Sequence, residues 1–243
     1  MHFSSETRRD DGVVERDFTI GEIPGVLWTP EAAPTPVPLV LLGHPGGLRT
    51  MRPRLAARAR SATRDGLAAA TIELPGSGER PRGAKVDAVR AELRQALQTG
   101  EPVTPEIVDR LVLPLVEQAV PEWQTCLDAL LELPEIGGPV GLSGGVISIG
   151  VRLAVVEPRI AAAVLFAGSF VPRVVLEEAR RVTVPVHVLL QWDDEGNDRQ
   201  VALDLFDALG SPEKSLYANL GGHTGVPAFA GEEAARFLAR HLR

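Results

Sequence analysis

The sequence predicts an α/β fold, in which a mostly parallel central sheet carries helices on both faces. Short apolar runs alternate along the chain with amphipathic stretches, as strands alternate with helices in βαβ units. The run at 38–42 is apolar throughout, which is typical of a parallel strand buried on both faces. A chain of 243 residues suits one such domain better than two small ones.

The expected elements run from an N-terminal hairpin to a C-terminal helix. Residues 1–12 are polar and charged, and we expect a flexible tail there, followed by a single domain at 13–243. Segments 18–20 and 26–28 flank a turn and are predicted to pair as the hairpin. Further strands are expected at 38–42, 68–74, directly before Ser143, and at 160–166, 184–190 and 215–220, with helices at 54–64 and 232–242.

A helical insertion is expected at about 81–133, before the strand that leads to Ser143. Residues 84–97 carry apolar side chains at helical spacing, and Thr104 followed by Pro105 is typical of a helix start. Pro114 and Pro121 are expected to interrupt the next helix, because a proline inside a helix removes a hydrogen bond and clashes with the preceding turn.

Two interpretations of this insertion remain open. It forms a long crossover that only covers the sheet, or residues 81–121 form a lid over a pocket. In the second case, apolar side chains of the proline-containing part would line that pocket: Leu111, Val112, Leu113 and Leu115.

The composition argues against several classes of partner. The formal net charge of −7 disfavours nucleic acid, which binds to basic surfaces. The longest apolar stretch, at 160–168, is too short to cross a bilayer. The single cysteine, Cys126, fits a reducing compartment, and its apolar neighbours indicate a packing role. We therefore expect a cytoplasmic protein with no nucleic-acid or membrane partner, and the sequence leaves homo-oligomer formation open.

A Gly-x-Ser-x-Gly motif at 141–145 carries the most information about function. Between a strand and a helix, this motif forms a sharp turn that exposes the serine hydroxyl, and its glycines allow strand and helix to approach closely. We expect Ser143 at the apex of that turn, as a nucleophile that needs a neighbouring base.

Comparison of the five histidines identifies a candidate base. His2 lies in the expected tail, His241 lies near the C-terminus and His187 lies in an apolar strand, so structural roles are expected for all three. His223 lies in a glycine-rich loop after the last expected strand, from which it could reach Ser143.

Four acidic residues follow the strand at 184–190, where an acid that orients the base would lie. Asp194 is favoured by its position, and Asp193 is the alternative. Glu195 and Asp198 are weaker candidates.

With these motifs, the chain resembles the α/β-hydrolase superfamily, and more narrowly its dienelactone hydrolase-like and acyl-peptidase-like esterases. The resemblance covers nearly the whole chain and rests on the segments 41–47, 73–78, 141–145, 191–194 and 221–223. The chain order serine, acid, histidine is also that of this superfamily. The resemblance implies a catalytic triad of Ser143, Asp194 and His223, and neither a metal nor another cofactor.

The resemblance also implies an oxyanion hole made of two backbone N–H groups, one of them from Gly144. Pro45 stands where a second glycine is common and has no N–H to donate. The second donor is therefore expected from Gly46 rather than Gly47. His44 would support this loop by hydrogen bonding or line the pocket.

The implied reaction is hydrolysis of small to medium, mainly apolar carboxylic esters through an acyl-enzyme. Trp192, Phe170 and His44 are the expected pocket residues. The same triad would also serve a peptidase or amidase, a thioesterase or a C–C bond hydrolase. A non-catalytic ligand-binding protein on the same fold is the alternative from another class.

Overall fold

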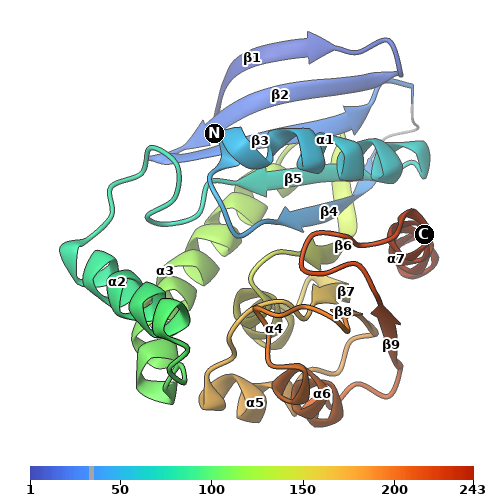
Figure 1. Ribbon diagram of the computed structural model, residues 1–243. Coiled ribbons are helices and arrows are strands. Elements are labelled where there is room, and N and C mark those ends of the chain that lie inside the picture. Colours follow the sequence, from blue (N-terminus) through green and yellow to red (C-terminus); the bar gives the residue numbers. More distant parts are fainter. Residues whose placement is uncertain (33–35) are drawn as a thin grey trace.

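The computed structural model describes residues 1–32 and 36–243, and these residues form one nine-stranded sheet with helices on both of its faces (Figure 1). The strand order across the sheet is β1-β2-β3-β5-β4-β6-β7-β8-β9. Strands β4 to β9 are parallel, whereas β1, β2 and β3 pair antiparallel. The strands are β1 (His2–Arg8), β2 (Val13–Ile20), β3 (Ile23–Pro30), β4 (Val37–Gly43), β5 (Ala68–Ile72), β6 (Ile136–Gly144), β7 (Ile160–Phe166), β8 (Val186–Gln191) and β9 (Lys214–Asn219).

The helices divide between the two faces of the sheet. Helices α1 and α7 cover one face, and α3, α4, α5 and α6 pack in sequence along the other. The arrangement confirms the α/β prediction, although α5 and α6 were not anticipated. The helices are α1 (Leu48–Arg64), α2 (Ala84–Thr99), α3 (Pro105–Leu131), α4 (Ile147–Val156), α5 (Arg173–Ala179), α6 (Arg199–Ala208) and α7 (Ala228–Leu242).

Side chains of β4 alternate between two apolar cores, one on each face of the sheet. Leu39 and Leu41 belong to the core under α3 and α4, and Val40 and Leu42 belong to the core under α1 and α7. Because successive side chains of a strand point to opposite faces, a strand buried on both sides must be apolar at every position. This explains the uninterrupted apolar runs of the sequence.

The N-terminal segment is a strand, and the expectation of a flexible tail at 1–12 was wrong. Strand β1 pairs antiparallel with β2 at the edge of the sheet. All its side chains are exposed except Phe3, which packs on the core and lies under the Arg16 guanidinium at 4.6 Å. An exposed edge strand needs no apolar alternation, and polar side chains there discourage pairing with other chains. The sequence therefore carried little sign of it.

Helix α3 runs through both of its prolines, contrary to the expected interruption. Its apolar side chains pack into the core along its whole length, so burial outweighs the local cost of Pro114 and Pro121. The start of the helix is as predicted: Thr104 is the N-cap, accepts a hydrogen bond from the Ile107 N–H at 3.4 Å, and is followed by a proline.

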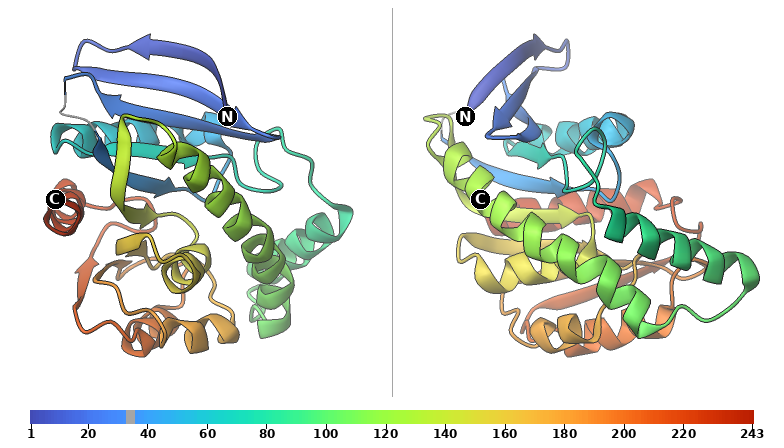
Figure 2. Two further views of the ribbon diagram at one scale, coloured as in Figure 1. Left: turned by 180° about the vertical axis from the view of Figure 1, so that it is seen from behind. Right: turned by 90° about the vertical axis from the view of Figure 1, so that its left-hand side faces the viewer.

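The insertion packs beside the sheet. In both views of Figure 2, α3 lies against the sheet and α2 lies outside α3. Val112 is buried in the core, Leu111 and Leu115 pack at its margin, and Leu113 is half-buried. None of these four residues lines the cavity described below, as the lid interpretation would require.

Helix α1 begins earlier than the expected 54–64 because a side chain from another part of the chain caps it. The Glu73 carboxylate accepts hydrogen bonds from the Leu48 N–H at 2.9 and 3.0 Å. An acceptor with negative charge stabilises the free N–H groups at a helix N-terminus.

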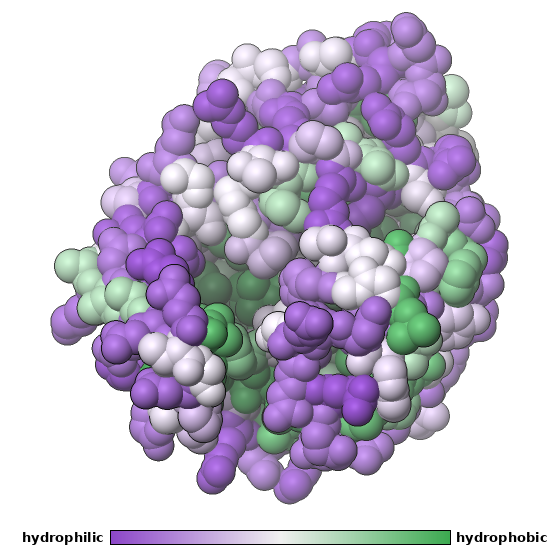
Figure 3. All heavy atoms as spheres, in the orientation of Figure 1, coloured by the Kyte–Doolittle hydropathy of each residue, from purple (hydrophilic) through white to green (hydrophobic). Residues whose placement is uncertain are grey.

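The face of the molecule in Figure 3 is mainly hydrophilic, with hydrophobic side chains gathered in hollows near its centre.

The ends of β4 and β6 approach so closely that Gly43 has no room for a larger side chain. A Cβ on Gly43 would lie 2.5 Å from the Gly144 carbonyl oxygen and 2.9 Å from the Gly145 Cα. We expect Gly43→Ala to lower the free energy of unfolding in urea by about 1–3 kcal/mol. In Gly231→Ala the added Cβ has no atom within 4 Å, so this helix substitution should raise stability by about 0.5–1 kcal/mol. Wild-type stability of Gly43→Ala would contradict the close approach.

Candidate active site

Ser143 is the second-last residue of β6, on the face of the sheet covered by α1 and α7. It pairs in register with Leu42 of β4 and Val164 of β7, both of which belong to the apolar core on that face. Paired residues of neighbouring strands point to the same side, so the hydroxyl is directed between the sheet and α1.

Two glycines make the sharp turn after β6. Ser143 therefore precedes the turn, whereas the sequence analysis placed it at the apex. Gly144 has φ of +69° and Gly145 has φ of +88°, after which α4 starts at Ile147. Glycine adopts positive φ without the Cβ penalty that other residues carry. The glycine pair therefore makes the turn, and Ser143 keeps the negative φ of the strand.

The structure brings His223 and Asp194 into hydrogen-bonding contact. His223 Nδ1 lies 2.7 Å from Asp194 Oδ2, with the histidine side chain half exposed and the aspartate side chain 2% exposed. Asp194 Oδ1 accepts a second hydrogen bond from the Gly196 N–H at 3.0 Å. The ring packs edge-on against Phe166 at 5.7 Å between centroids. A carboxylate on Nδ1 leaves Nε2 as the free proton acceptor.

Asp193 does not contact His223 but binds the backbone of the loop that carries it. Its exposed carboxylate accepts hydrogen bonds from the Gly221 N–H at 2.9 and 3.0 Å and from the Gly222 N–H at 3.0 Å. These N–H groups of Gly222 and Gly221 hold the pKa of Asp193 below its usual value. The side chain thus fixes the loop that carries His223.

The two weaker acid candidates lie away from the histidine. Glu195 is exposed, and Asp198 caps the N-terminus of α6 by accepting hydrogen bonds from the Gln200 and Val201 N–H groups. Neither contacts His223.

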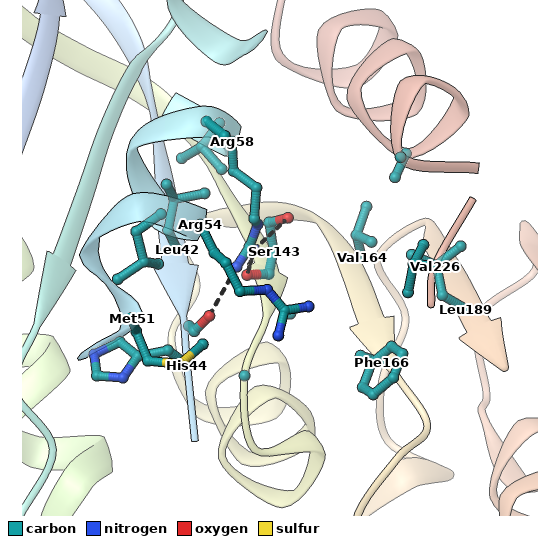
Figure 4. Close-up of a pocket in the computed structure, with 18 of the residues that line it drawn as sticks. Leu42, His44, Met51, Arg54, Arg58, Ser143, Val164, Phe166, Leu189 and Val226 are labelled. Atoms are coloured by element: carbon teal, nitrogen blue, oxygen red, sulfur yellow. Dashed lines mark hydrogen bonds between the residues drawn. The ribbon is translucent and has the colours of Figure 1, made fainter. Parts of the chain in front are cut away.

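Arg58 of α1 is the residue at this site that the sequence analysis missed. Its Nη2 donates to Ser143 Oγ at 2.9 Å and to the Ser143 carbonyl, and its Nη1 donates to the Gly43 carbonyl at 2.9 Å (Figure 4). Within the described residues, Arg58 is the one hydrogen-bond partner of that Oγ. Burial, and then the charge of Arg54, lower the pKa of Arg58 to about 10, so the group stays protonated at neutral pH.

A cavity of about 420 Å³ lies between the sheet, α1 and α7, and both Ser143 and His223 line it. Most of its wall is apolar, formed by side chains of three strands, two helices and the loop after His223: Val40, Leu42, Leu55, Val164, Phe166, Leu189, Val226, Ala234 and Leu238. In Figure 4, Arg58 and Arg54 lie on one side of the cavity and Phe166 lies on the other.

Two of the residues expected in the pocket do not line it. Trp192 is 43% exposed and stacks under the Arg199 guanidinium at 4.3 Å. Phe170 packs at the margin of the other core. His44 lines the cavity, as does Phe166, which contacts His223.

Of the two glycines expected in the oxyanion hole, one lies in the cavity wall and the other does not. Gly144 lies in the cavity wall next to Ser143. Gly46 does not line the cavity. In this part of the chain the wall is formed by Gly43, at the end of β4, and by His44 and Pro45 of the loop that follows.

His44 supports the loop after β4, and its titration should affect stability. The buried ring donates from Nε2 to the Ile72 carbonyl at 2.9 Å, and burial lowers the pKa of His44. Since an unfolded histidine has a pKa of about 6.5, the unfolded state takes up more protons below that pH, and stability falls there. His44→Gln keeps an N–H donor but does not titrate. We expect its melting temperature to fall less than that of the wild type between about pH 7.5 and pH 5.5. Equal pH dependence would attribute the effect to other groups, such as His187.

Two further groups that carry reactive chemistry have packing roles. His187 is buried in β8, with Nδ1 2.7 Å from Ser215 Oγ. Cys126 is buried in α3, where burial raises the pKa of its thiol to about 12. The part of the chain that the structure describes contains no cluster of metal-ligating side chains and no helix that could span a membrane.

Comparison with known proteins gives matches among solved structures alone: no protein-family model and no curated protein matches the chain. An esterase from an Arctic intertidal metagenomic library, described as cold-adapted and solved as a PEG-bound complex, is 28% identical, with 100% of both chains covered and a TM-score of 0.77.

More distant matches share the fold. An acetyl xylan esterase from Paenibacillus sp. R4 is 15% identical, with 99% of this chain and 88% of that chain covered and a TM-score of 0.67. A protein from Klebsiella pneumoniae that is assigned as a dienelactone hydrolase is 16% identical, with 93% and 97% covered and a TM-score of 0.67. The sheet order and these matches lead to one conclusion: the chain has the α/β-hydrolase fold, and it resembles a solved esterase over its full length.

Proposed function

We propose that this protein is a serine esterase that hydrolyses carboxylic esters through a Ser143–His223–Asp194 triad. The observation that carries the proposal is that His223, hydrogen-bonded to Asp194, lines the same cavity as Ser143. The full-length likeness to a cold-adapted esterase supports the same chemistry.

In the proposed reaction, Ser143 Oγ attacks the ester carbonyl while His223 Nε2 takes the hydroxyl proton. Asp194 keeps the proton of the neutral ring on Nδ1 and stabilises the imidazolium that forms. The Gly144 N–H stabilises the oxyanion, and such a donor is typically worth about 3 kcal/mol of the barrier. His223 then protonates the leaving alcohol, and water releases the acid from the acyl-enzyme by the same steps.

This reaction requires Ser143 Oγ to gain a second hydrogen-bond partner. The hydroxyl accepts a hydrogen bond from Arg58 in the structure and must donate to His223 at the start of catalysis. A hydroxyl can accept one hydrogen bond while it donates another, so the contact with Arg58 is compatible with proton transfer to His223.

The cavity fits an acyl group of small to medium size. Its wall is mainly aliphatic, and about 420 Å³ would hold a short acyl chain with part of the alcohol. The test is a series of p-nitrophenyl esters from acetate to dodecanoate, assayed with the wild-type protein. We expect the highest kcat/KM at short to medium chains. Absence of hydrolysis across the series by a folded protein would contradict the proposal.

A further inference from the structure

Arg54 and Arg58 form a positively charged pair that faces the cavity with no acidic partner. They stand four residues apart on α1, so both project from the same side of the helix. Both line the cavity, and in Figure 4 the Arg58 guanidinium reaches Ser143 while the Arg54 guanidinium extends into the cavity. No aspartate or glutamate lies in the cavity wall.

Several other arginines of this acidic protein, including one on the same helix, have acidic partners. Arg52, two residues before Arg54, bonds Glu15 at 2.6 Å and Asp17 at 2.8 Å, and Arg80 bonds Glu122 at 2.6 Å. In the described residues, neither Arg54 nor Arg58 takes part in a salt bridge, and the acceptors of Arg58 are two carbonyls and one hydroxyl. Arg58 is partly buried and Arg54 is exposed, so the cost of a buried charge without a counter-ion falls on Arg58, and the like charge of Arg54 one turn away adds to it.

The position of the pair indicates which part of an ester it would contact. The leaving alcohol must lie near His223, which protonates it, and Phe166 packs against that ring. Figure 4 places Phe166 across the cavity from Arg58. The acyl part would therefore extend toward the two arginines.

We propose that Arg54 and Arg58 bind a carboxylate in the acyl part of the substrate, so that the preferred substrates are half-esters of short dicarboxylic acids. This inference rests on the proposed esterase function. A carboxylate accepts the guanidinium donors more strongly than neutral oxygens do. Its binding would give Arg58 a charged acceptor besides the neutral oxygens of Gly43 and Ser143.

The test compares two esters of nearly the same shape, monoethyl succinate with its carboxylate and ethyl succinamate with a neutral amide. The wild type should favour the half-ester by at least about 10-fold in kcat/KM, and Arg58→Gln and Arg54→Gln should each lower that ratio by about 10-fold or more. Arg60→Gln is the matched control, because Arg60 lies on the same helix but pairs with Asp11. If Arg58→Gln fails to fold, Arg54→Gln, at an exposed position, still decides. Equal turnover of the two esters, or a ratio unchanged in the folded variants, would overturn the inference.

A binding measurement separates this inference from the proposed function. In calorimetric titrations, succinate should bind to the wild type more tightly than succinamide, and Arg54→Gln should remove the difference. If no ester is hydrolysed but succinate binds in this way, the esterase proposal fails and the carboxylate site stands. If esters are hydrolysed and succinate binds no better than succinamide, the carboxylate site is refuted.

Discussion

Replacement of Ser143 by alanine is expected to lower kcat for ester hydrolysis by at least about 10⁴-fold, because it removes the atom that forms the acyl-enzyme. The fold should persist, since Oγ has one hydrogen-bond partner and Arg58 retains its two carbonyl acceptors. Steady-state hydrolysis of a p-nitrophenyl ester and a thermal melt measure the two quantities on the same preparation.

Ser148→Ala is the matched control for this substitution. Ser148 lies five residues further on, fully buried in α4, and its Oγ has no hydrogen-bond partner among the described residues. Its activity should stay near that of the wild type. Substantial hydrolysis by a correctly folded Ser143→Ala protein would mean that another group is the nucleophile.

Asp194→Asn is expected to lower kcat by about 10⁴-fold, whereas Asp193→Asn should cost about 10-fold or less. An amide at position 194 can donate to Nδ1 of His223, and Nε2 would then carry the proton and could not accept one from Ser143. An amide at 193 keeps one oxygen that can accept from the Gly221 and Gly222 N–H groups, so the loop stays close to its position.

The comparison is made on kcat/KM for one ester across pH, with both variants checked for folding. A larger loss in Asp193→Asn would move the triad acid by one residue. Equal small losses would mean that His223 does not need an orienting carboxylate.

Much of the architecture could be predicted because strands of a buried parallel sheet appear in the sequence as uninterrupted apolar runs. The run at 160–166 matches β7, and the hairpin at 18–28 matches β2 and β3. Asp194, which follows β8, contacts His223, whereas Asp193 binds the N–H groups of Gly221 and Gly222; the assignment of Asp194 as the triad acid remains a prediction. These features depend on local pattern and strand order.

The features that were missed depend on contacts between distant segments. β1 is held by hydrogen bonds to β2 rather than by apolar alternation. Helix α3 keeps its prolines because it is buried, and α1 starts where Glu73 caps it. Arg58 reaches a serine 85 residues away, and its spacing from Arg54 on an expected helix was the single available signal.

Labelling with a fluorophosphonate, followed by mass spectrometry of the tryptic peptides, tests whether Ser143 is an activated nucleophile. The reagent reacts with a serine that a neighbouring base activates. We expect one adduct per chain, on Ser143, which is absent in Ser143→Ala and strongly reduced in Asp194→Asn. No adduct on the folded wild type, or an adduct on another serine, would mean that Ser143 is not the nucleophile.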